Sequence, residues 1–257
     1  MNTENRQIKI FEYLKAHGSV SVNTLASIFN VSDMTIRRDL SALENASLIV
    51  KRYGKAEILT KNELDIVFPE RAKKNTSLKH KVAQLTLPLI KHASSIYVDC
   101  SSTAFELLEC LPQDQEMTVF TNSLAALNVL VRNPKLSLFA IGGFLCNDHN
   151  TLDDETSIET AKQIFVDVAL ISCVGFSYEG LFNNAYRGTQ IKRIISKNAD
   201  KCILLADHTK AFQRGIFLLN EWEAISYLVT DEPPEATLYS SISQRGVKII
   251  YEHNQAF

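Results

Sequence analysis

The chain lacks the cysteine and histidine patterns of disulfide-rich or metal-binding proteins and the long apolar segments of secreted or membrane-spanning proteins. Its five cysteines are widely spaced and form no CxxC pair, and its six histidines show no ligand spacing. These patterns predict neither a disulfide framework nor a metal site. No run approaches the roughly 18 apolar residues of a membrane span, and the first residues lack a signal peptide's apolar core. We therefore expect a cytoplasmic protein with no membrane partner.

Excess positive charge is lacking as well. The 27 basic and 29 acidic residues give a net charge of −2, which argues against a general coat for nucleic acid. The distribution is uneven, because residues 1–58 hold eight basic and six acidic side chains and the remainder holds 19 and 23. A mildly basic head on an acidic body predicts that any DNA contact is confined to the head. With 257 residues, of which 46% are hydrophobic, one large domain or two smaller ones are expected.

Residues 21–46 have the pattern of two short helices joined by a turn at Asn30 and Val31, with Ser21 and Ser32 as caps. The apolar stripes of the two helices are Leu25, Ile28, Phe29 and Ile36, Leu40, Leu43. The outer face of the second helix is short, polar and basic, as suits a helix that enters a major groove. The predicted DNA contacts here are Ser21, Ser32, Met34, Thr35, Arg37, Arg38, Ser41 and Asn45.

A helix is also predicted over residues 4–17, with Ile10, Phe11 and Leu14 inward and Arg6, Lys9 and Lys15 outward. Residues 48–59 indicate two strands around a turn at Tyr53 and Gly54, which is the wing of a winged helix. Lys51, Arg52 and Lys55 lie at or near its tip and are predicted to contact phosphates. The alternative for these elements is an ordinary amphipathic hairpin with solvated charges.

Residues 59–78 are polar and contain Pro69, which predicts a linker. From Lys79 to residue 257, apolar runs rich in β-branched residues alternate with helical stretches. This alternation predicts an α/β domain with a mostly parallel sheet covered on both faces. The expected strands are 96–100, 118–121, 136–141, 168–174, 202–206, 227–230 and 247–251. The expected helices are 82–90, 103–111, 124–133, 158–165, 189–198 and 235–245.

Polar or small residues follow five of these strands. Ligands of open parallel sheets bind beyond the carboxyl ends of the strands, and hydroxyls with free N–H groups at helix starts suit a phosphate. One shared pocket for an anionic ligand is the better account, although each residue alone could be a cap, a turn or a solvated side chain. The predicted ligand-binding residues are Asp99, Ser101, Ser102, Thr103, Thr121, Asn122, Ser123, Gly142, Gly143, Gly175, Lys192, Asp207 and Lys210.

The sequence Ser-Asp-Met-Thr-Ile-Arg-Arg-Asp-Leu from Ser32, followed by Leu43-Glu44, resembles the helix-turn-helix signature of the DeoR family of bacterial transcription regulators. The resemblance continues through Asp99-x-Ser-Ser-Thr, Thr121-Asn122-Ser123-Leu124, Gly142-Gly143, Gly175, Lys192-Arg193, Asp207-x-x-Lys210 and Thr230-Asp231. It implies a winged helix-turn-helix followed by an α/β domain that resembles ribose-5-phosphate isomerase and senses phosphorylated sugars.

The resemblance implies a DNA-binding repressor of a carbohydrate-metabolism operon, without catalytic residues or a cofactor. Its expected partners are a double-stranded DNA operator and a phosphorylated sugar effector. Helix-turn-helix proteins usually bind near-palindromic sites as dimers or higher oligomers, so we expect a homo-oligomer, dimer or tetramer, assembled through residues 79–257.

The chain departs from the family's pattern at several positions. Ser101 stands where glycine is common, Cys146 where an arginine is frequent and Asp154 near a frequent glycine, while the wing has Gly54 and Lys55 instead of two glycines. A thiol in place of a cation beside an acidic loop is expected to weaken attraction for a phosphate. Two alternatives therefore stay open: a sugar-phosphate isomerase-like enzyme with a DNA-binding head, and a DNA-binding protein whose effector pocket is non-functional.

Overall fold

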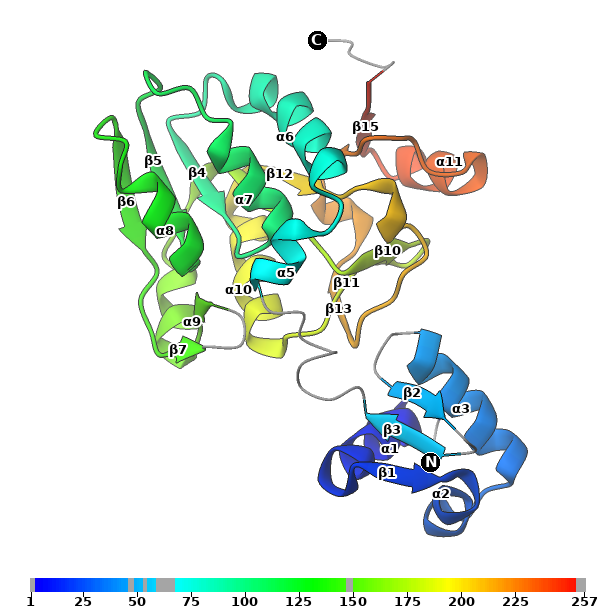
Figure 1. Cartoon of the computed structure of the whole chain (residues 1–257). Helices are drawn as coiled ribbons and strands as arrows, with labels where there is room; N and C mark the ends of the chain where they lie inside the picture. The colour runs from blue at the N-terminus through cyan, green and yellow to red at the C-terminus, as the bar shows by residue number, and fades with distance from the viewer. Residues whose placement is uncertain (1–2, 46–48, 53–54, 59–67, 147–149, 253–257) are drawn as a thin grey trace. The chain divides into compact units, whose positions relative to one another are not determined.

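The computed structural model describes residues 3–45, 49–52, 55–58, 68–146 and 150–252. It divides into two compact units, Met1–Ile66 and Val67–Phe257 (Figure 1). Within the described residues, no helix combines the length and the apolar character that crossing a membrane requires.

The first unit is a small helical domain with a three-stranded antiparallel sheet. Its elements are α1 (Thr3–His17), β1 (Ser19–Ser21), α2 (Val22–Phe29), α3 (Asp33–Asn45), β2 (Ile49–Arg52) and β3 (Lys55–Ile58), and the strand order is β1-β3-β2. The Ser21 hydroxyl accepts from the Thr24 N–H and the Ser32 hydroxyl from the Thr35 N–H, so both predicted caps are confirmed. Asn30 takes the left-handed conformation, at φ 50°, that ends α2.

The core of this unit holds Ile10, Leu14, Leu25, Ile36 and Leu40, all fully buried. The predicted orientation was wrong for two side chains, Ile28 and Arg6. Ile28 is 44% exposed and does not belong to the core stripe of α2. Arg6 was expected outward but is buried, because it reaches an acidic partner on α3. The predicted turn at Tyr53 and Gly54 lies outside the described residues.

The second unit is built on a seven-stranded sheet, in which every neighbouring pair is parallel, in the order β15-β14-β12-β9-β4-β5-β6. These strands are β4 (Ser95–Val98), β5 (Met117–Thr121), β6 (Leu136–Ala140), β9 (Val166–Ile171), β12 (Ala199–Leu205), β14 (Tyr227–Val229) and β15 (Lys248–Ile250). Each corresponds to one of the runs predicted as a strand, so the parallel α/β fold is confirmed.

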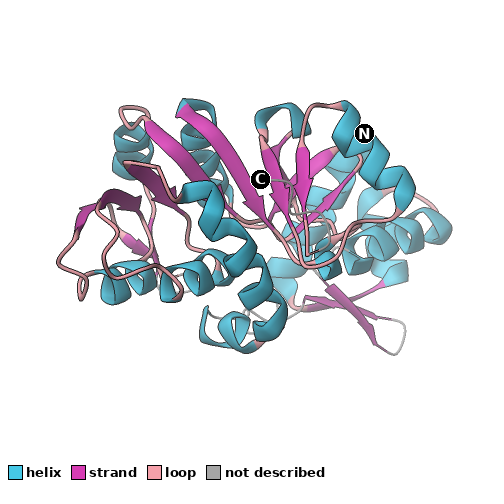
Figure 2. Cartoon of the chain, turned by 90° about the horizontal axis from the view of Figure 1, so that it is seen from above, coloured by secondary structure: helices cyan, strands magenta, loops and turns pink. Residues whose placement is uncertain are grey.

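Helices cover both faces of this sheet (Figure 2). They are α5 (Phe68–Lys73), α6 (Thr76–Ile90), α7 (Ser102–Glu109), α8 (Leu124–Leu130), α9 (Glu155–Ala161), α10 (Tyr186–Asn198) and α11 (Ala236–Gln244). Because side chains alternate along a strand, Ile96 and Val98 of β4 join the core under α6, α7 and α8, whereas Tyr97 joins the core under α9, α10 and α11.

Short antiparallel strands and 3-10 turns were not predicted. The hairpin β7 (Leu145–Cys146) with β8 (Thr151–Leu152) follows β6. A separate three-stranded sheet contains β10 (Gly175–Ser177), β11 (Gly180–Asn183) and β13 (Phe217–Asn220). The 3-10 turns are η1 (His208–Lys210) and η2 (Trp222–Ala224).

The second unit begins inside the segment that was predicted as a linker, residues 59–78, and therefore earlier than expected. Helix α5 and the start of α6 lie inside that range. Phe68 is buried, and its ring packs edge-on against Phe105 of α7 at 5.2 Å between centroids. Pro69 occupies the first turn of α5, where its missing N–H costs no helical hydrogen bond. One aromatic anchor therefore attaches this polar segment to the α/β unit.

Candidate nucleic-acid interface and effector site

Helix α3 presents its predicted outer face to solvent. Arg37 and Arg38 are exposed, and the Met34 side chain is 77% exposed. On the opposite side, Ile36, Leu40 and Leu43 are buried and hold the helix against the rest of the unit. An exposed arginine-bearing face on a rigidly packed helix is the geometry that a major-groove helix requires.

A buried ion pair fixes α3 against α1. Arg6 Nε lies 2.6 Å from Asp39 Oδ2, Arg6 Nη2 donates to Asp39 Oδ1 at 3.2 Å, and Gln7 adds a third hydrogen bond to that oxygen. The hydrogen bond to Asp39 raises the pKa of Arg6. Sequence reasoning missed this pair, although Asp39 lies three residues after Ile36 and four before Leu43, and thus on the buried face of α3.

The wing is tied to α3 through a lysine. Lys51 Nζ lies 2.6 Å from Glu44 Oε2 and donates to the Ser41 hydroxyl at 3.0 Å. The hydrogen bond from Lys51 lowers the pKa of Glu44. A groove runs between the helix and the wing, and its lining residues are Val22, Arg37, Leu40, Ser41, Lys51 and Lys55. Much of the Lys51 charge is therefore balanced within the protein, whereas Lys55 is exposed beside the groove.

The remaining predicted DNA contacts have different positions. Ser21 and Ser32 serve as helix caps, with exposed hydrogen bonds. Thr35 is partly exposed and its hydroxyl contacts that of Ser32 at 2.9 Å. Asn45 ends α3 and Arg52 ends β2, and their side chains lie outside what the structure describes.

In the second unit, Asp99 and Lys192 form a buried ion pair at the carboxyl end of β4. Lys192 Nζ lies 2.6 Å from Asp99 Oδ2 and donates to the Ser172 carbonyl oxygen at 2.9 Å. Asp99 also accepts the Ser101 and Ser172 N–H groups, at 2.9 and 2.8 Å. Burial would raise the pKa of Asp99, but the Lys192 charge and these hydrogen bonds outweigh it, so the pKa is lowered. The pair joins the ends of β4 and β9.

Lys210 reaches the same edge of the sheet from η1. Its Nζ donates to the Ser172 hydroxyl at 2.8 Å and to the Thr103 hydroxyl at 3.3 Å. Thr103 lies in the first turn of α7, and Ser101 caps that helix by accepting the Ala104 N–H. A lysine ammonium thus stands at a helix N-terminus, where the macrodipole is already positive.

Two further cations, which sequence reasoning placed outside the ligand site, lie at this edge. Lys79 of α6 is buried and donates to the carbonyl oxygens of Arg71, at 2.5 Å, and Lys74. Burial, and then repulsion from Lys210, lowers the pKa of Lys79 to about 8. Arg71 Nε is buried and has no hydrogen-bond partner among the described residues. Clustered positive charge with an unsatisfied donor favours an anion as the missing partner.

The predicted residues after β5 carry structural hydrogen bonds. The Thr121 hydroxyl donates to the Val98 carbonyl and accepts the Ser123 N–H. The Asn122 side chain accepts from the Tyr97 hydroxyl at 3.0 Å and donates to the Leu152 carbonyl oxygen at 3.3 Å. Ser123 caps α8. This segment therefore holds β4, β5 and the β7–β8 hairpin together.

Two of the predicted glycines, Gly143 and Gly175, are explained by close approaches within the protein. Gly143 has φ 129°, and a Cβ there would lie 2.1 Å from Ser157 Oγ and 2.6 Å from Asp154 Oδ1. A Cβ at Gly175 would lie 2.2 Å from the Gln213 carbonyl oxygen. Gly142 precedes this turn, and its carbonyl oxygen accepts from the Ser157 hydroxyl. Contacts inside the protein thus suffice to explain Gly143 and Gly175.

The two departures in the acidic loop also have defined positions. Asp154 caps α9 by accepting the Ser157 N–H at 2.9 Å, and it accepts the Phe144 N–H at 3.3 Å. The Ser157 hydrogen bond lowers the pKa of Asp154. Cys146 lies on β7 opposite Thr151 and is half-buried. Residues 147–149 of this loop lie outside the described residues.

Near η1, Asp207 accepts hydrogen bonds from the Thr209 N–H and hydroxyl. His208, which sequence reasoning did not use, lies beside Asp231, with 2.7 Å between Nδ1 and Oδ2. The hydrogen bond to Asp231 raises the pKa of His208. Asp207 and Asp231 thus shape the turn that presents Lys210.

A winged helix with an exposed arginine-bearing helix, followed by a parallel-sheet unit with cations at its carboxyl edge, defines a two-domain DNA-binding transcription regulator. The DeoR-like helix-turn-helix domain matches residues 6–62, and the DeoR C-terminal sensor domain matches residues 74–232. The chain belongs to the DeoR family of transcriptional regulators.

Curated relatives match over nearly the whole chain. The HTH-type transcriptional regulator GolR of Listeria innocua is 32% identical over 95% of this chain and 96% of its own. The transcriptional repressor GlcR of Bacillus subtilis is 28% identical, over 97% and 96%. The glycerol-3-phosphate regulon repressor of Escherichia coli is 24% identical, over 97% and 99%.

Among solved structures, ribose 5-phosphate isomerase A from Neisseria gonorrhoeae aligns over 53% of each chain, with a TM-score of 0.39 and 12% identity. The family assignment rests on the matches above and takes nothing from this likeness.

Proposed function

We propose that this regulator represses a carbohydrate-metabolism operon and that a phosphorylated sugar, bound at the carboxyl edge of the second unit's sheet, controls its DNA binding. The observation that carries the proposal is the group of Arg71, Lys79 and Lys210 beside the N-terminus of α7. The names of the relatives GlcR and the glycerol-3-phosphate regulon repressor support the direction of control and the class of ligand.

In this proposal the first unit binds a double-stranded operator through α3 and the wing. The second unit binds the effector and forms the contacts of a homo-oligomer, whose symmetry matches that of a near-palindromic operator. The edge strand β6 supports assembly through this unit, because Phe139 on it and Phe144 and Leu145 after it are 44%, 81% and 48% exposed. In this proposal the protein acts in the cytoplasm, where an operator would lie.

The geometry favours a sensor over an isomerase. A general base needs a carboxylate that is free to accept a proton from substrate. Both Asp99 oxygens already accept hydrogen bonds or an ion pair, and one Asp207 oxygen is taken by Thr209. The hypothesis of a non-functional pocket was motivated by Cys146 and Asp154. The Asp154 carboxylate has a structural role, since it caps α9 by accepting the Ser157 N–H and also accepts the Phe144 N–H.

A gel-shift experiment tests the function. Purified protein is incubated with the DNA upstream of its own gene and of neighbouring genes, with and without a panel of sugar phosphates. A specific shift that one sugar phosphate abolishes supports the proposal. A specific shift that no phosphate changes, together with a thermal-shift screen that finds no stabilising phosphate, would support the non-functional pocket. Isomerisation of a sugar phosphate by the protein would support the enzyme.

Arg38→Ala is expected to weaken operator binding by about 1–3 kcal/mol, the size of one good base contact. The side chain is exposed on the outer face of α3, so its loss leaves the core unchanged. Affinity is measured by fluorescence anisotropy at one fixed salt concentration, because phosphate contacts depend strongly on salt. Lys9→Ala removes an exposed cation from α1 and is the matched control. Equal affinities of Arg38→Ala and wild type would defeat the assignment.

Lys210→Met is expected to raise the concentration of sugar phosphate needed for the DNA response by about tenfold or more, since a hydrogen bond to a charged group contributes roughly 1.5–3 kcal/mol. Operator affinity without effector is expected to stay as in wild type. The control is Lys201→Met, which removes an exposed lysine from the neighbouring strand β12. An unchanged effector response in Lys210→Met would place the anion elsewhere.

A further inference from the structure

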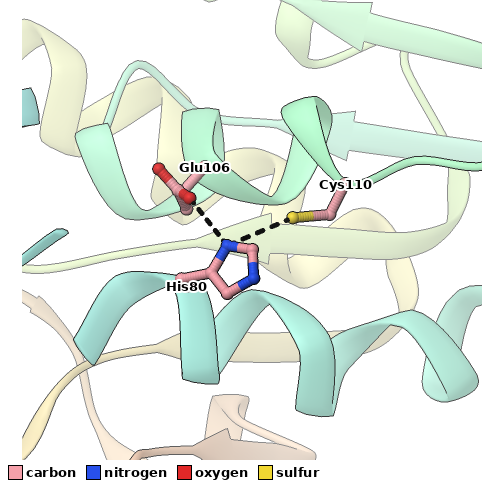
Figure 3. A group of neighbouring side chains, drawn as sticks. All are labelled: His80, Glu106 and Cys110. Carbon is pink, nitrogen blue, oxygen red and sulfur yellow. Dashed lines mark hydrogen bonds and ion pairs between the residues drawn. The ribbon is translucent and has the colours of Figure 1, made fainter. Parts of the chain in front are cut away.

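A second cluster of chemically reactive side chains lies between α6 and α7, outside the groups that the proposed effector site uses. Figure 3 shows His80 of α6 pointing toward Glu106 and Cys110, which lie one turn apart at the end of α7. His80 Nδ1 lies 3.0 Å from Glu106 Oε1 and 3.8 Å from Cys110 Sγ. Their three ligand atoms all lie within 4.8 Å of one another.

We propose that His80, Glu106 and Cys110 bind a Zn²⁺ ion that links α6 to α7. Imidazole nitrogen, carboxylate oxygen and thiolate sulfur are the three donor types that zinc takes in proteins. Three protein ligands leave a fourth position for water. Sequence spacing did not indicate this site, because the histidine and the other two ligands come from different helices.

Two of the three ligand separations are close to those of a tetrahedral zinc ion. Zinc bonds of about 2.0–2.1 Å to nitrogen and oxygen and about 2.3 Å to sulfur place nitrogen and oxygen about 3.3 Å apart, and nitrogen and sulfur about 3.6 Å apart. The two measured separations are 3.0 and 3.8 Å. The His80 side chain is 54% exposed, which leaves it room to adjust on metal binding.

In the metal-free cluster, His80 Nδ1 cannot donate to Glu106 and accept from the Cys110 thiol at the same time. If His80 Nδ1 carries a proton and donates it to Glu106, it cannot accept from the Cys110 thiol. If Nδ1 accepts from the thiol, its lone pair faces the Glu106 carboxylate. A metal ion at the centre satisfies the nitrogen, the oxygen and the sulfur together.

The surroundings favour a borderline-soft ion over a hard one. Mg²⁺ and Ca²⁺ prefer shells made of oxygen, and this cluster offers one carboxylate. A hydrogen bond from the Gln84 side chain, one turn after His80 on α6, lowers the pKa of the Cys110 thiol but does not outweigh burial. Burial and then Glu106 raise the pKa of Cys110, so zinc binding near neutral pH is expected to release the thiol proton.

The test is a titration of tag-free, chelator-treated full-length protein with Zn²⁺ by calorimetry, and with Co²⁺ by absorption spectroscopy. We expect one Zn²⁺ per chain, no comparable binding of Mg²⁺, and a thiolate-to-cobalt charge-transfer band. Zn²⁺ is also expected to protect Cys110 from alkylation, which peptide mass spectrometry locates. Cys110→Ser and His80→Ala are each expected to weaken Zn²⁺ binding at least tenfold.

Matched controls are Cys146→Ser and His92→Ala, which change a half-buried cysteine and an exposed histidine outside the cluster. His208→Ala tests the other group that could hold a metal, His208 with Asp231 and Glu232. Three results would each overturn the proposal: no Zn²⁺ binding by wild type, binding unchanged in Cys110→Ser and His80→Ala, or binding lost in His208→Ala alone. Circular dichroism confirms that the variants are folded.

Discussion

Asp39→Ala is expected to destabilise the first unit, which carries the candidate DNA-binding face, although Asp39 itself lies on the buried face of α3. The substitution leaves the Arg6 guanidinium without the carboxylate that accepts two of its hydrogen bonds. Removing one member of a buried ion pair leaves an uncompensated charge, which costs more than the pair contributed. Breaking such a pair costs roughly 3–5 kcal/mol, and at the lower end of this range the unfolded fraction of the first unit should rise on the order of 100-fold.

Hydrogen exchange of the full-length protein measures this effect in the first unit alone. Peptides from α1 and α3 are expected to exchange about 100-fold faster in Asp39→Ala, and peptides from the second unit at the wild-type rate. The double variant Arg6→Met, Asp39→Leu replaces the pair by apolar side chains and is expected to recover most of the protection. Wild-type exchange in α1 and α3 of the single variant would show that the pair does not hold these helices together.

The folding pattern of the first unit was largely predictable because α2 and α3 are short, capped and clearly periodic. Asn30, Ser21 and Ser32 gave local signals that need no knowledge of the rest of the chain. Arg6 did not, because a helical wheel cannot show which charged residue finds a partner on another helix. Its partner Asp39 is a charged residue on the otherwise apolar face of α3. An acidic side chain at such a position was the one sign in the sequence that a buried cation would pair with it.

The parallel sheet was predictable for a different reason. Strands covered on both faces read as nearly continuous apolar runs, and the strands of this sheet gave such runs, although the edge strand β6 contains a serine and is largely exposed. The strands β7, β8, β10, β11 and β13 have only two to four residues each, too few for a pattern. Helix α5 was hidden in a polar segment, because its attachment depends on the single aromatic side chain of Phe68.

Candidate site residues were predicted from their positions at the ends of strands. Position alone does not distinguish a residue that binds a ligand from one that stabilises the fold. Lys192 and Lys210 both have polar neighbours at the sheet edge, yet Lys192 is sealed in an ion pair while Lys210 stands at a helix N-terminus. Arg71 and Lys79 were assigned to the linker and to its boundary. Only the packing of α5 and α6 brings them to the same edge, and the sequence does not contain that information in any local form.

Lys192→Met is expected to lower the free energy of unfolding of the second unit by about 3–5 kcal/mol, the cost of leaving one buried charge without its partner. Asp99 is 1% exposed, so water cannot replace the lost ammonium. Trp222 is the chain's one tryptophan and is fully buried in this unit, so its fluorescence during urea unfolding reports on this unit selectively. Lys197→Met, on the exposed side of α10, is the matched control and is expected to change stability by less than about 0.5 kcal/mol.

The pH dependence separates an ion-pair role of Lys192 from simple packing. In the wild type the pKa of Asp99 is lowered, so its contribution to stability is complete above the unfolded-state value and is lost as the pH falls through the folded-state value. In Lys192→Met, burial dominates and raises the pKa of Asp99 above its unfolded-state value, so protonation relieves the penalty as the pH falls. The stability gap between the two proteins is therefore expected to narrow as the pH falls from neutral towards the unfolded-state pKa of Asp99. A gap that stays constant over that range would mean that Lys192 acts through its hydrocarbon chain alone.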